Sequence, residues 1–344
     1  MMDMSKAFDT VAQNSIMQDL KTVLQQDELN LITILVKDVQ LAVKLNGKIG
    51  QPFTTNIGTP QGDGLSPILF TLYLANALRT STPAHLLDHQ YCDPNLATNV
   101  IPLQYADDIC WIGINDSKGI QHLKTIIPDQ LGKRNLNINQ DKTEEHVINR
   151  NGTNDWKQCK YLGTLLDTDS DLARRKRLAN TALAKIKPIL KDKKLSLNIK
   201  LRSYNAYVSS VFLYNSETWT LTKTLSNAID TFHRRHLRGI LDIRWPKVIS
   251  NDDLYETTAE SIWSDKITNR RLTFFGHILR LPDETPVRKC LDKFNIPHKK
   301  PRGAQKQTWI RSVSKDLESR GIDFRDATRL AQDRPGWRSM VRGV

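Results

Sequence analysis

The sequence predicts an α+β fold, because its first half mixes strand and helix signals and its second half is helical. The clearest strand signal is Asn46-Gly47, a dipeptide that favours the tight turn of a hairpin since both residues tolerate positive φ angles. A second hairpin is expected around Asp107-Asp108, which apolar segments flank on both sides. From residue 171 on, apolar residues recur at helical spacing.

Turn residues and hydrophobic periodicity give the expected elements of the first half. Ser66 and Pro67 suit the N-cap and first turn of a helix that continues to about Arg79, and because this helix is apolar nearly all round we expect it to be buried. The polar stretch 80–98 predicts a loop. The other expected elements are a strand ending near Met4, helices over 15–24, 29–36 and 118–133, hairpin strands over 40–45 and 48–55, and short strands near 146–148 and 159–165.

Four prolines cluster within residues 282–301 of the second half and mark a linker between the last two expected helices. We divide the chain into residues 1–170, a basic helical region 171–245 and a basic helical C-terminal region 246–344. Helices are expected over 174–190, 199–213, 225–241, 259–281 and 305–317.

The net charge of +13 is concentrated in the second half. Residues 1–170 hold 14 Lys and Arg against 19 Asp and Glu, whereas residues 171–344 hold 36 against 18. Such a basic region favours a polyanionic partner, above all nucleic acid, because each neutralised phosphate releases counterions. A solvated basic surface without a partner is the alternative.

The composition also indicates in which cellular compartment the protein is expected. No stretch approaches the roughly 18 consecutive apolar residues of a membrane span, and the N-terminus lacks a signal-peptide pattern. We therefore expect no membrane partner and an intracellular protein, in the nucleus or cytoplasm. The four cysteines are scattered without zinc-ligand spacing, so we expect reduced thiols and no structural zinc.

Three acidic residues are candidate metal ligands. Asp107 and Asp108 are adjacent at the tip of the expected hairpin, and Asp3 ends another apolar strand. Neighbouring carboxylates repel each other unless a cation compensates them, and hard oxygen ligands suit Mg²⁺. An Asp-Asp pair is most often a solvated turn, but the apolar flanks here favour a site.

A glycine-rich loop precedes the buried helix. Residues 58–64 contain three glycines, which allow close backbone approach to a ligand, and the N-terminus of a helix favours phosphate. Such loops are common, so this one alone leaves open both nucleotide binding and an ordinary connection.

Together these segments resemble a known family. Residues 3–9, 59–67 and 105–108 follow the order and approximate spacing of the palm motifs of reverse transcriptases, and residues 136–144 and 161–163 look like the next two motifs. The resemblance covers about residues 1–170. Within the second half, residues 214–219 and 271–277 look like C-terminal segments of non-LTR (LINE-type) retrotransposon proteins.

The resemblance implies a right-hand polymerase palm, with an antiparallel sheet and helices on one face, followed by a helical thumb and a helical C-terminal region. The first metal ligand would be the third residue, so we expect a fragment that lacks the fingers. The implied activity is RNA-directed DNA polymerisation, with an RNA template, a DNA primer or target and deoxynucleoside triphosphates as partners.

The resemblance also assigns roles to individual residues. Asp3, Asp107 and Asp108 would hold two Mg²⁺ ions, or Mn²⁺, and Lys142 would protonate the leaving pyrophosphate, although it could equally be a surface lysine. Phe8 would pack beneath the sugar and favour deoxynucleotides. The remaining implied residues are Gln61 and Gly62 at the nucleotide, Tyr161, Leu162 and Gly163 at the primer end, and Arg174, Arg175, Lys176, Arg177, Arg234, Arg235 and Arg238 on the nucleic-acid backbone.

Two questions stay open at this point. The chain is either a polymerase palm and thumb or a catalytically dead remnant that binds nucleic acid, and an RNA-copying RNA polymerase is a third option that Phe8 disfavours. For Trp245, Trp263, Trp309 and Trp337, stacking on bases and interior packing are both possible, and interior packing is the commoner outcome.

Overall fold

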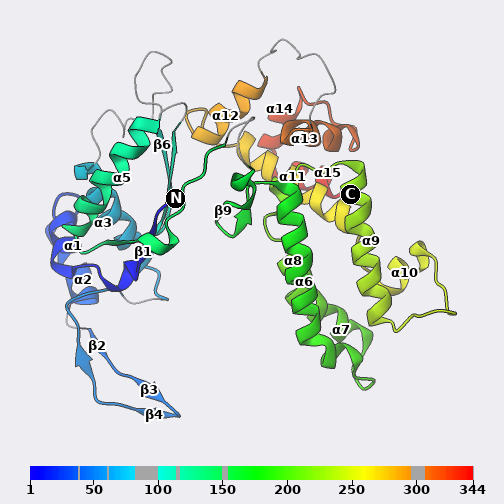
Figure 1. The fold of residues 1–344 in the computed structure, drawn as a ribbon, viewed down its shortest axis with the longest axis horizontal. Coiled ribbons are helices and arrows are strands. Elements are labelled where there is room, and N and C mark those ends of the chain that lie inside the picture. The colour runs from blue at the N-terminus through cyan, green and yellow to red at the C-terminus, as the bar shows by residue number, and fades with distance from the viewer. Residues whose placement is uncertain are drawn as a thin grey trace. The chain divides into compact units, whose positions relative to one another are not determined.

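The computed structural model describes residues 1–37, 39–59, 62–81, 100–113, 117–148, 154–295 and 307–343. They form two compact units, Met1–Val147 and Ile148–Val344 (Figure 1). The first unit combines strands and helices around one core, and the second is mainly helical, so the α+β class is confirmed. The hairpin near residues 159–165, which we expected in the first domain, lies in the second unit.

The strands that carry the acidic motifs form one antiparallel arrangement. A hairpin joins the two strands around Asp107, as predicted, and a bridge between Met2 and Ile109 links it to the N-terminal strand. That strand pairs in turn with the one that precedes Lys142. In spatial order the strands are β6 (Val100–Tyr105), β7 (Asp108–Gly113), β1 (Asp3–Ser5) and β8 (Asn137–Asn139).

The helices of the first unit pack their apolar sides into one core. The helix predicted from Ser66 is present, but Ile68 is 66% exposed, so the expectation of burial all round is wrong. The cap also differs: the Asp63 carboxylate accepts hydrogen bonds from the backbone N–H of Leu65 and Ser66. The helices are α1 (Gln13–Leu20), α2 (Gln26–Val36), α3 (Ser66–Ser81) and α5 (Ser117–Gly132).

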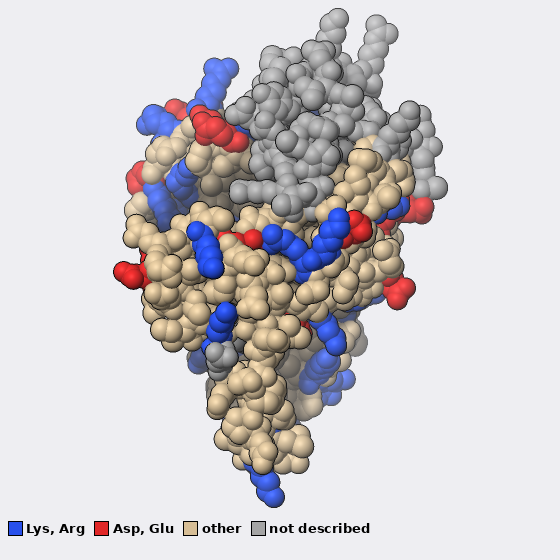
Figure 2. Space-filling view, turned by 90° about the vertical axis from the view of Figure 1, so that its left-hand side faces the viewer, with Lys and Arg blue, Asp and Glu red and all other residues tan. Residues whose placement is uncertain are grey.

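An exposed ribbon extends from the first unit. Asn46 and Gly47 have φ angles of 49° and 80°, so the predicted turn is confirmed. Figure 2 views the left-hand side of Figure 1, where basic and acidic side chains are scattered among uncharged ones. The strand expected near residues 146–148 is absent from this described segment. The ribbon strands are β2 (Gln40–Leu41), β3 (Lys44–Leu45), β4 (Lys48–Ile49) and β5 (Phe53–Thr54).

The second unit follows most of the predicted helical pattern and contains further helices. Ala259, where a helix was expected to begin, has a φ angle of 49° and ends a further helix (Asn251–Thr258), and the expected helix begins at Trp263. The proline-rich segment contains a helix that begins at Pro286, because proline fits the first turn of a helix. The elements are α6 (Thr168–Lys191), α7 (Leu197–Tyr204), a π-helical turn (Asn205–Ser209), α8 (Ser210–Phe212), α9 (Lys223–Ile240), α10 (Asn251–Thr258), α11 (Trp263–Leu279), α12 (Pro286–Asn295), α13 (Trp309–Glu318), α14 (Ala327–Gln332) and α15 (Arg334–Arg342).

Two histidines of α9 belong to the core of the second unit. The His233 ring is fully buried and stacks on Trp263 at 4.3 Å between ring centres. His236 lies between the Tyr204 hydroxyl and the Asn180 side-chain oxygen, each at 3.1 Å from a ring nitrogen. Burial lowers the pKa of His233 from 6.5 to about 3 and the pKa of His236 to about 4. Both rings are therefore neutral near pH 7, and they do not extend a basic surface.

This burial predicts a loss of stability in acid. Between pH 6.5 and the lowered pKa values, only the unfolded chain takes up protons at these positions, so the free energy of unfolding should fall as the pH falls. Each histidine contributes about 1.4 kcal/mol per pH unit across that range. Urea unfolding at pH 7, 6 and 5 would measure the slope. The His233→Phe variant keeps a stacked ring and should lose about half of it; an unchanged slope would contradict the account.

Candidate functional site

The backbone register brings the acidic motifs together. The Met2 N–H donates to the Ile109 carbonyl at 2.8 Å, and the Ile109 N–H donates to the Met2 carbonyl at 3.3 Å. In antiparallel pairing the next residues along each strand, Asp3 and Asp108, then stand opposite each other, a position in which Cβ atoms lie roughly 5 Å apart. Asp107 lies in the turn just before Asp108. Two segments that are distant in the sequence thus place three carboxylate side chains on neighbouring backbone positions.

Lys142 contacts the first of these carboxylates. It ends a 3₁₀ turn (Gln140–Lys142) directly after β8, and the Asn139 side chain caps this turn by accepting from the Asp141 N–H at 3.1 Å. Because Asn139 pairs with Asp3 across the sheet, the turn places the Lys142 Nζ 3.4 Å from the Asp3 Oδ2. That oxygen is buried and has no hydrogen-bond partner. Within the protein, the Lys142 ammonium is the cation that faces this oxygen.

Phe8 and the glycine-rich loop are attached to the same strand end. Phe8 follows β1 in a 3₁₀ turn (Ala7–Asp9) and stacks on Phe70 of α3, with ring centres 4.3 Å apart. The Thr59 N–H donates to the Phe8 carbonyl at 3.0 Å. Gly58 has a φ angle of 81°, and a Cβ there would lie 3.1 Å from the Asp9 carbonyl, so glycine is required. The backbone of Phe8 is thereby bonded to the loop, and its ring packs against α3.

The loop continues beyond this anchor. Gly62 has a φ angle of 103°, which again favours glycine, and open space surrounds the position of a Cβ. Gln61, predicted to lie at the nucleotide, falls outside the described residues. The burial of Phe8 against the core is compatible both with the sugar-facing role and with the simpler role of a core aromatic.

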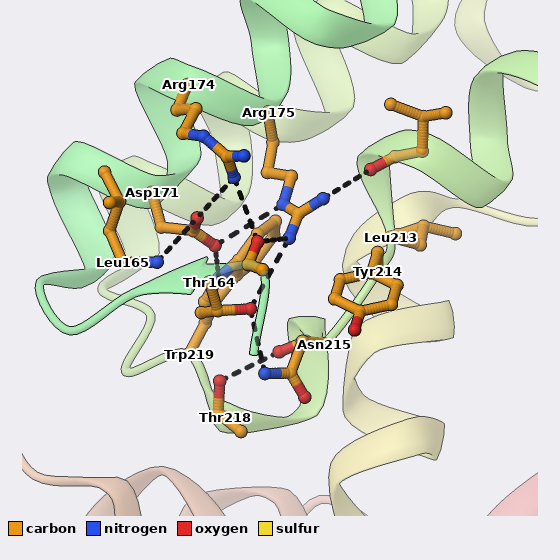
Figure 3. A network of polar contacts seen from close by, with 12 residues as sticks. Thr164, Leu165, Asp171, Arg174, Arg175, Leu213, Tyr214, Asn215, Thr218 and Trp219 are labelled. Carbon is orange, nitrogen blue, oxygen red and sulfur yellow. Dashed lines mark hydrogen bonds and ion pairs between the residues drawn. The ribbon is translucent and has the colours of Figure 1, made fainter. Parts of the chain in front are cut away.

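The predicted primer-end residues form a tight hairpin in the second unit. Its strands are β9 (Lys160–Tyr161) and β10 (Thr164–Leu165), and the turn residues Leu162 and Gly163 have φ angles of 46° and 77°. A positive φ angle strains leucine, so other contacts must hold the turn. The Tyr214 hydroxyl donates to the Leu162 carbonyl at 3.1 Å. The Arg175 guanidinium, which Figure 3 shows beside Asp171 and Tyr214, donates to the Gly163 carbonyl at 2.6 Å.

A buried carboxylate organises these contacts. Asp171 of α6 is fully buried and accepts hydrogen bonds from the Leu165 N–H at 3.1 Å and from the Trp219 indole at 2.9 Å (Figure 3). Its second role is electrostatic, since the Arg175 Nε lies 3.7 Å from the Asp171 Oδ2. Burial lowers the pKa of Arg175, and the Asp171 charge opposes that shift. We call Asp171, Arg175, Tyr214 and Trp219, with the turn, the hairpin network.

This geometry corrects one predicted contact. Arg175 is only 5% exposed, and its guanidinium also lies 4.6 Å from the centre of the Tyr214 ring. Its hydrogen-bonding capacity is directed into the hairpin network, so it is not presented to a nucleic-acid backbone. The motifs predict no role for Asp171, and none for Tyr214 although it begins the motif at residues 214–219. Asp171, Leu172 and Arg175 share one side of α6, a spacing that indicates a buried charged pair.

The other predicted basic residues differ in exposure. Arg177 and Arg235 are exposed, and Lys176 is half-buried with its Nζ 5.8 Å from the Phe232 ring centre. Arg174, also half-buried, donates to the Gly163 carbonyl. The remaining two are half-buried: Arg234 donates to the Thr231 hydroxyl, and Arg238 to the Ile249 carbonyl and the Asn251 side chain.

Comparison with known proteins agrees with the order of the motifs. Residues 1–166 match the family described as reverse transcriptase (RNA-dependent DNA polymerase). These residues form a reverse transcriptase domain. The match covers the carboxylates, Lys142, the glycine-rich loop and the hairpin turn, so the resemblance drawn from the motifs is confirmed.

Similar curated proteins extend the likeness beyond this reverse transcriptase domain. The chain is 24% identical over 266 residues to a probable RNA-directed DNA polymerase from transposon BS of Drosophila melanogaster, and 23% identical over 273 residues to that of the mobile element jockey of Drosophila funebris. These alignments cover 70% and 71% of the chain but 28% of each polymerase. The chain thus spans about a quarter of their length.

Two further comparisons concern a shorter curated protein and a solved structure. The putative transposon-derived protein F52C9.6 of Caenorhabditis elegans is 24% identical over 273 residues, which cover 71% of the chain and 96% of that protein. Among solved structures, telomerase from Candida albicans in complex with a telomeric RNA fragment has a TM-score of 0.39 at 13% identity, over 86% of the chain and 49% of telomerase. Among the described residues, none of the helices is long and apolar enough to cross a membrane.

Proposed function

We propose that the chain contains the palm and thumb of an RNA-directed DNA polymerase of a non-LTR retrotransposon. In this proposal it adds deoxynucleotides to the 3′-hydroxyl of a DNA primer or target, copying an RNA template. The observation that carries the proposal is the register that sets Asp3 opposite Asp108 beside the reverse transcriptase turn containing Asp107. Such a convergence of carboxylates suits nucleotidyl transfer.

Divalent metal is the implied cofactor of the family, and the donor set fits it. Asp3, Asp107 and Asp108 offer only carboxylate oxygens, and the buried Asp3 Oδ2 has no hydrogen bond within the protein. We assign two Mg²⁺ ions to these residues, with Mn²⁺ as a substitute. When bound, two such ions stabilise the attacking and leaving oxygens of an in-line displacement.

The remaining roles belong to the side chains around the carboxylates. In the proposal, Lys142 Nζ holds the proton that the leaving pyrophosphate takes, which its 68% exposed side chain can reach. The Phe8 ring supports the sugar, and Gln61 and Gly62 approach the template and the incoming base. Tyr161, Leu162 and Gly163 hold the primer end, while Arg174, Lys176, Arg177, Arg234, Arg235 and Arg238 contact the nucleic-acid backbone.

Primer extension on an RNA template tests this function. The full chain should extend an annealed DNA primer in the presence of Mg²⁺ and deoxynucleotides, and an Asp107→Ala/Asp108→Ala variant should not. A filter-binding assay on the same substrate serves as the control, because the variant should still bind. Binding without extension by both proteins would contradict the polymerase and support the second candidate, a nucleic-acid-binding remnant, which the charge of residues 171–344 favours.

The Phe8 ring gives a separate prediction about sugar selection. Because Phe8 follows the acidic strand, its backbone is bonded to the glycine-rich loop and its ring is fixed against Phe70, removal of the ring should admit a 2′-hydroxyl. The Phe8→Ala variant should incorporate ribonucleotides more efficiently relative to deoxynucleotides, by at least about tenfold if the discrimination is worth about 1.4 kcal/mol. Single-nucleotide kcat/KM values for both sugars measure the ratio. An unchanged ratio would remove the sugar-selecting role and reopen the option of an RNA-copying RNA polymerase.

A further inference from the structure

The loop between α9 and α10 displays the most exposed aromatic side chain of the described residues. Trp245 is 87% exposed, the highest fraction among their large hydrophobic side chains. The other tryptophans are buried or half-buried, and Trp219, Trp263 and Trp337 are each at most 1% exposed. Interior packing therefore accounts for those rings, whereas the Trp245 indole lies in solvent.

The loop that carries Trp245 is anchored to the second unit at both ends. Ile243 and Ile249 pack against the core of the second unit, and the residues between them are all exposed. The Ile243 N–H donates to the Arg238 carbonyl at 2.9 Å, while the Arg238 guanidinium donates to the Asn251 side chain at 2.8 Å. Within the loop, the Lys247 N–H donates to the Arg244 carbonyl at 2.8 Å. The indole is therefore held out by an anchored backbone.

Basic residues flank the exposed ring within the loop. Arg244 and Lys247 lie on either side of Trp245 in the sequence, and both are exposed. One acidic residue, Asp242, lies 3.2 Å from Arg244 in an exposed pair, which water screens strongly. A flat aromatic ring with flanking cations is the combination that binds single strands, because bases stack on the ring and phosphates meet the cations.

We infer that residues 243–249 form a base-stacking site for single-stranded nucleic acid. The Trp245 ring lies against an unpaired base, and Arg244 and Lys247 lie along the neighbouring phosphates. The identity of the ligand class rests on the proposed function, but the contact itself requires neither metal nor catalysis. We call these residues the tryptophan loop.

Binding of a labelled single-stranded oligonucleotide to the full chain tests the tryptophan loop. Fluorescence anisotropy without metal or nucleotides, at one fixed salt concentration, should give a dissociation constant that rises at least about fivefold in the Trp245→Ala variant. The Trp245→Phe variant should retain most of the affinity, because it keeps a ring. The matched control is Tyr207→Ala, which removes another exposed aromatic side chain of the second unit and should leave the affinity unchanged.

A second oligonucleotide separates stacking from other effects. With abasic sites along the strand, the wild type and Trp245→Ala should bind equally, because no base is present to stack. Salt titration adds an independent check: Lys247→Ala should lower the salt dependence of binding, whereas Trp245→Ala should not. RNA and DNA versions of the same strand show which sugar is preferred.

The outcomes distinguish this inference from the proposed function. If the wild type binds and Trp245→Ala binds equally well, or loses affinity for the abasic strand to the same extent, the tryptophan loop is contradicted while the polymerase is not. If Trp245→Ala instead abolishes self-association in sedimentation and leaves binding intact, the loop is a protein contact. If no form binds any single strand, the tryptophan loop is contradicted, whereas primer extension on the annealed substrate still decides the polymerase.

Discussion

The Asp3→Asn variant of the full chain should lose nucleotide transfer almost completely while remaining folded. The substitution keeps the size of the side chain and removes one negative charge from the carboxylates that the Met2–Ile109 bridge aligns. Loss of a charged metal ligand removes several kcal/mol of transition-state stabilisation, so kcat should fall about a thousandfold. The measurement is single-turnover primer extension on an RNA template.

A neighbouring carboxylate provides the control for this variant. Asp141 is exposed, one residue before Lys142, and Asp141→Asn changes the net charge equally without touching the aligned carboxylates. It should extend primers at nearly the wild-type rate, and both variants should give the circular dichroism spectrum of the wild type. Equal rates for Asp3→Asn and the wild type would show that Asp3 does not take part in the chemistry.

The Asp171→Ala variant should lower the free energy of unfolding of the second unit by about 3–5 kcal/mol. It leaves the Arg175 charge buried without its partner and removes the acceptor of the Leu165 N–H and the Trp219 indole. Urea unfolding followed by tryptophan fluorescence measures the change, because six of the seven tryptophans lie after residue 148. The strained turn at Leu162 should loosen as well, since Arg175 holds the Gly163 carbonyl in place.

The matched control for this second variant lies on the same helix. Asp169→Ala removes an exposed carboxylate from the first turn of α6 and should cost less than about 1 kcal/mol. The Asp171→Ala/Arg175→Met double variant should be more stable than Asp171→Ala alone, because it removes the unpaired charge together with its partner. If Asp171→Ala lowers the free energy of unfolding no more than Asp169→Ala does, the hairpin network does not stabilise the second unit.

Local signals in the sequence predicted those features that depend on a few neighbouring residues. Asn46-Gly47 predicted its turn because both residues tolerate positive φ angles, and the apolar flanks of Asp107-Asp108 predicted the hairpin that is found. The likeness of residues 1–166 to reverse transcriptases was predicted from ordered motifs and is confirmed. The metal-binding and substrate-binding roles of individual residues stay predictions.

Features that depend on tertiary contacts were missed or misplaced. One local feature was also missed: Ser66 was predicted as the N-cap, but the Asp63 carboxylate accepts hydrogen bonds from the N–H groups of Leu65 and Ser66 at the start of the helix. Arg175 was predicted with its basic neighbours, yet the pairing with Asp171 draws it into the interior. Single-residue charge counts cannot separate a buried ion pair from a basic surface, since that distinction depends on which side of α6 packs against residues 211–219.

Binding of Mn²⁺ to the full chain, followed by electron paramagnetic resonance, tests the central claim directly. The claim is that Asp3, Asp107 and Asp108 share one cation site, and the measurement does not require the chain to polymerise. The wild type should quench the signal of free Mn²⁺, and Mg²⁺ should compete for the same site. Asp3→Asn and Asp108→Asn should each weaken that binding strongly, whereas Asp141→Asn should not. Equal Mn²⁺ binding by the wild type and the Asp3→Asn variant would contradict a shared site.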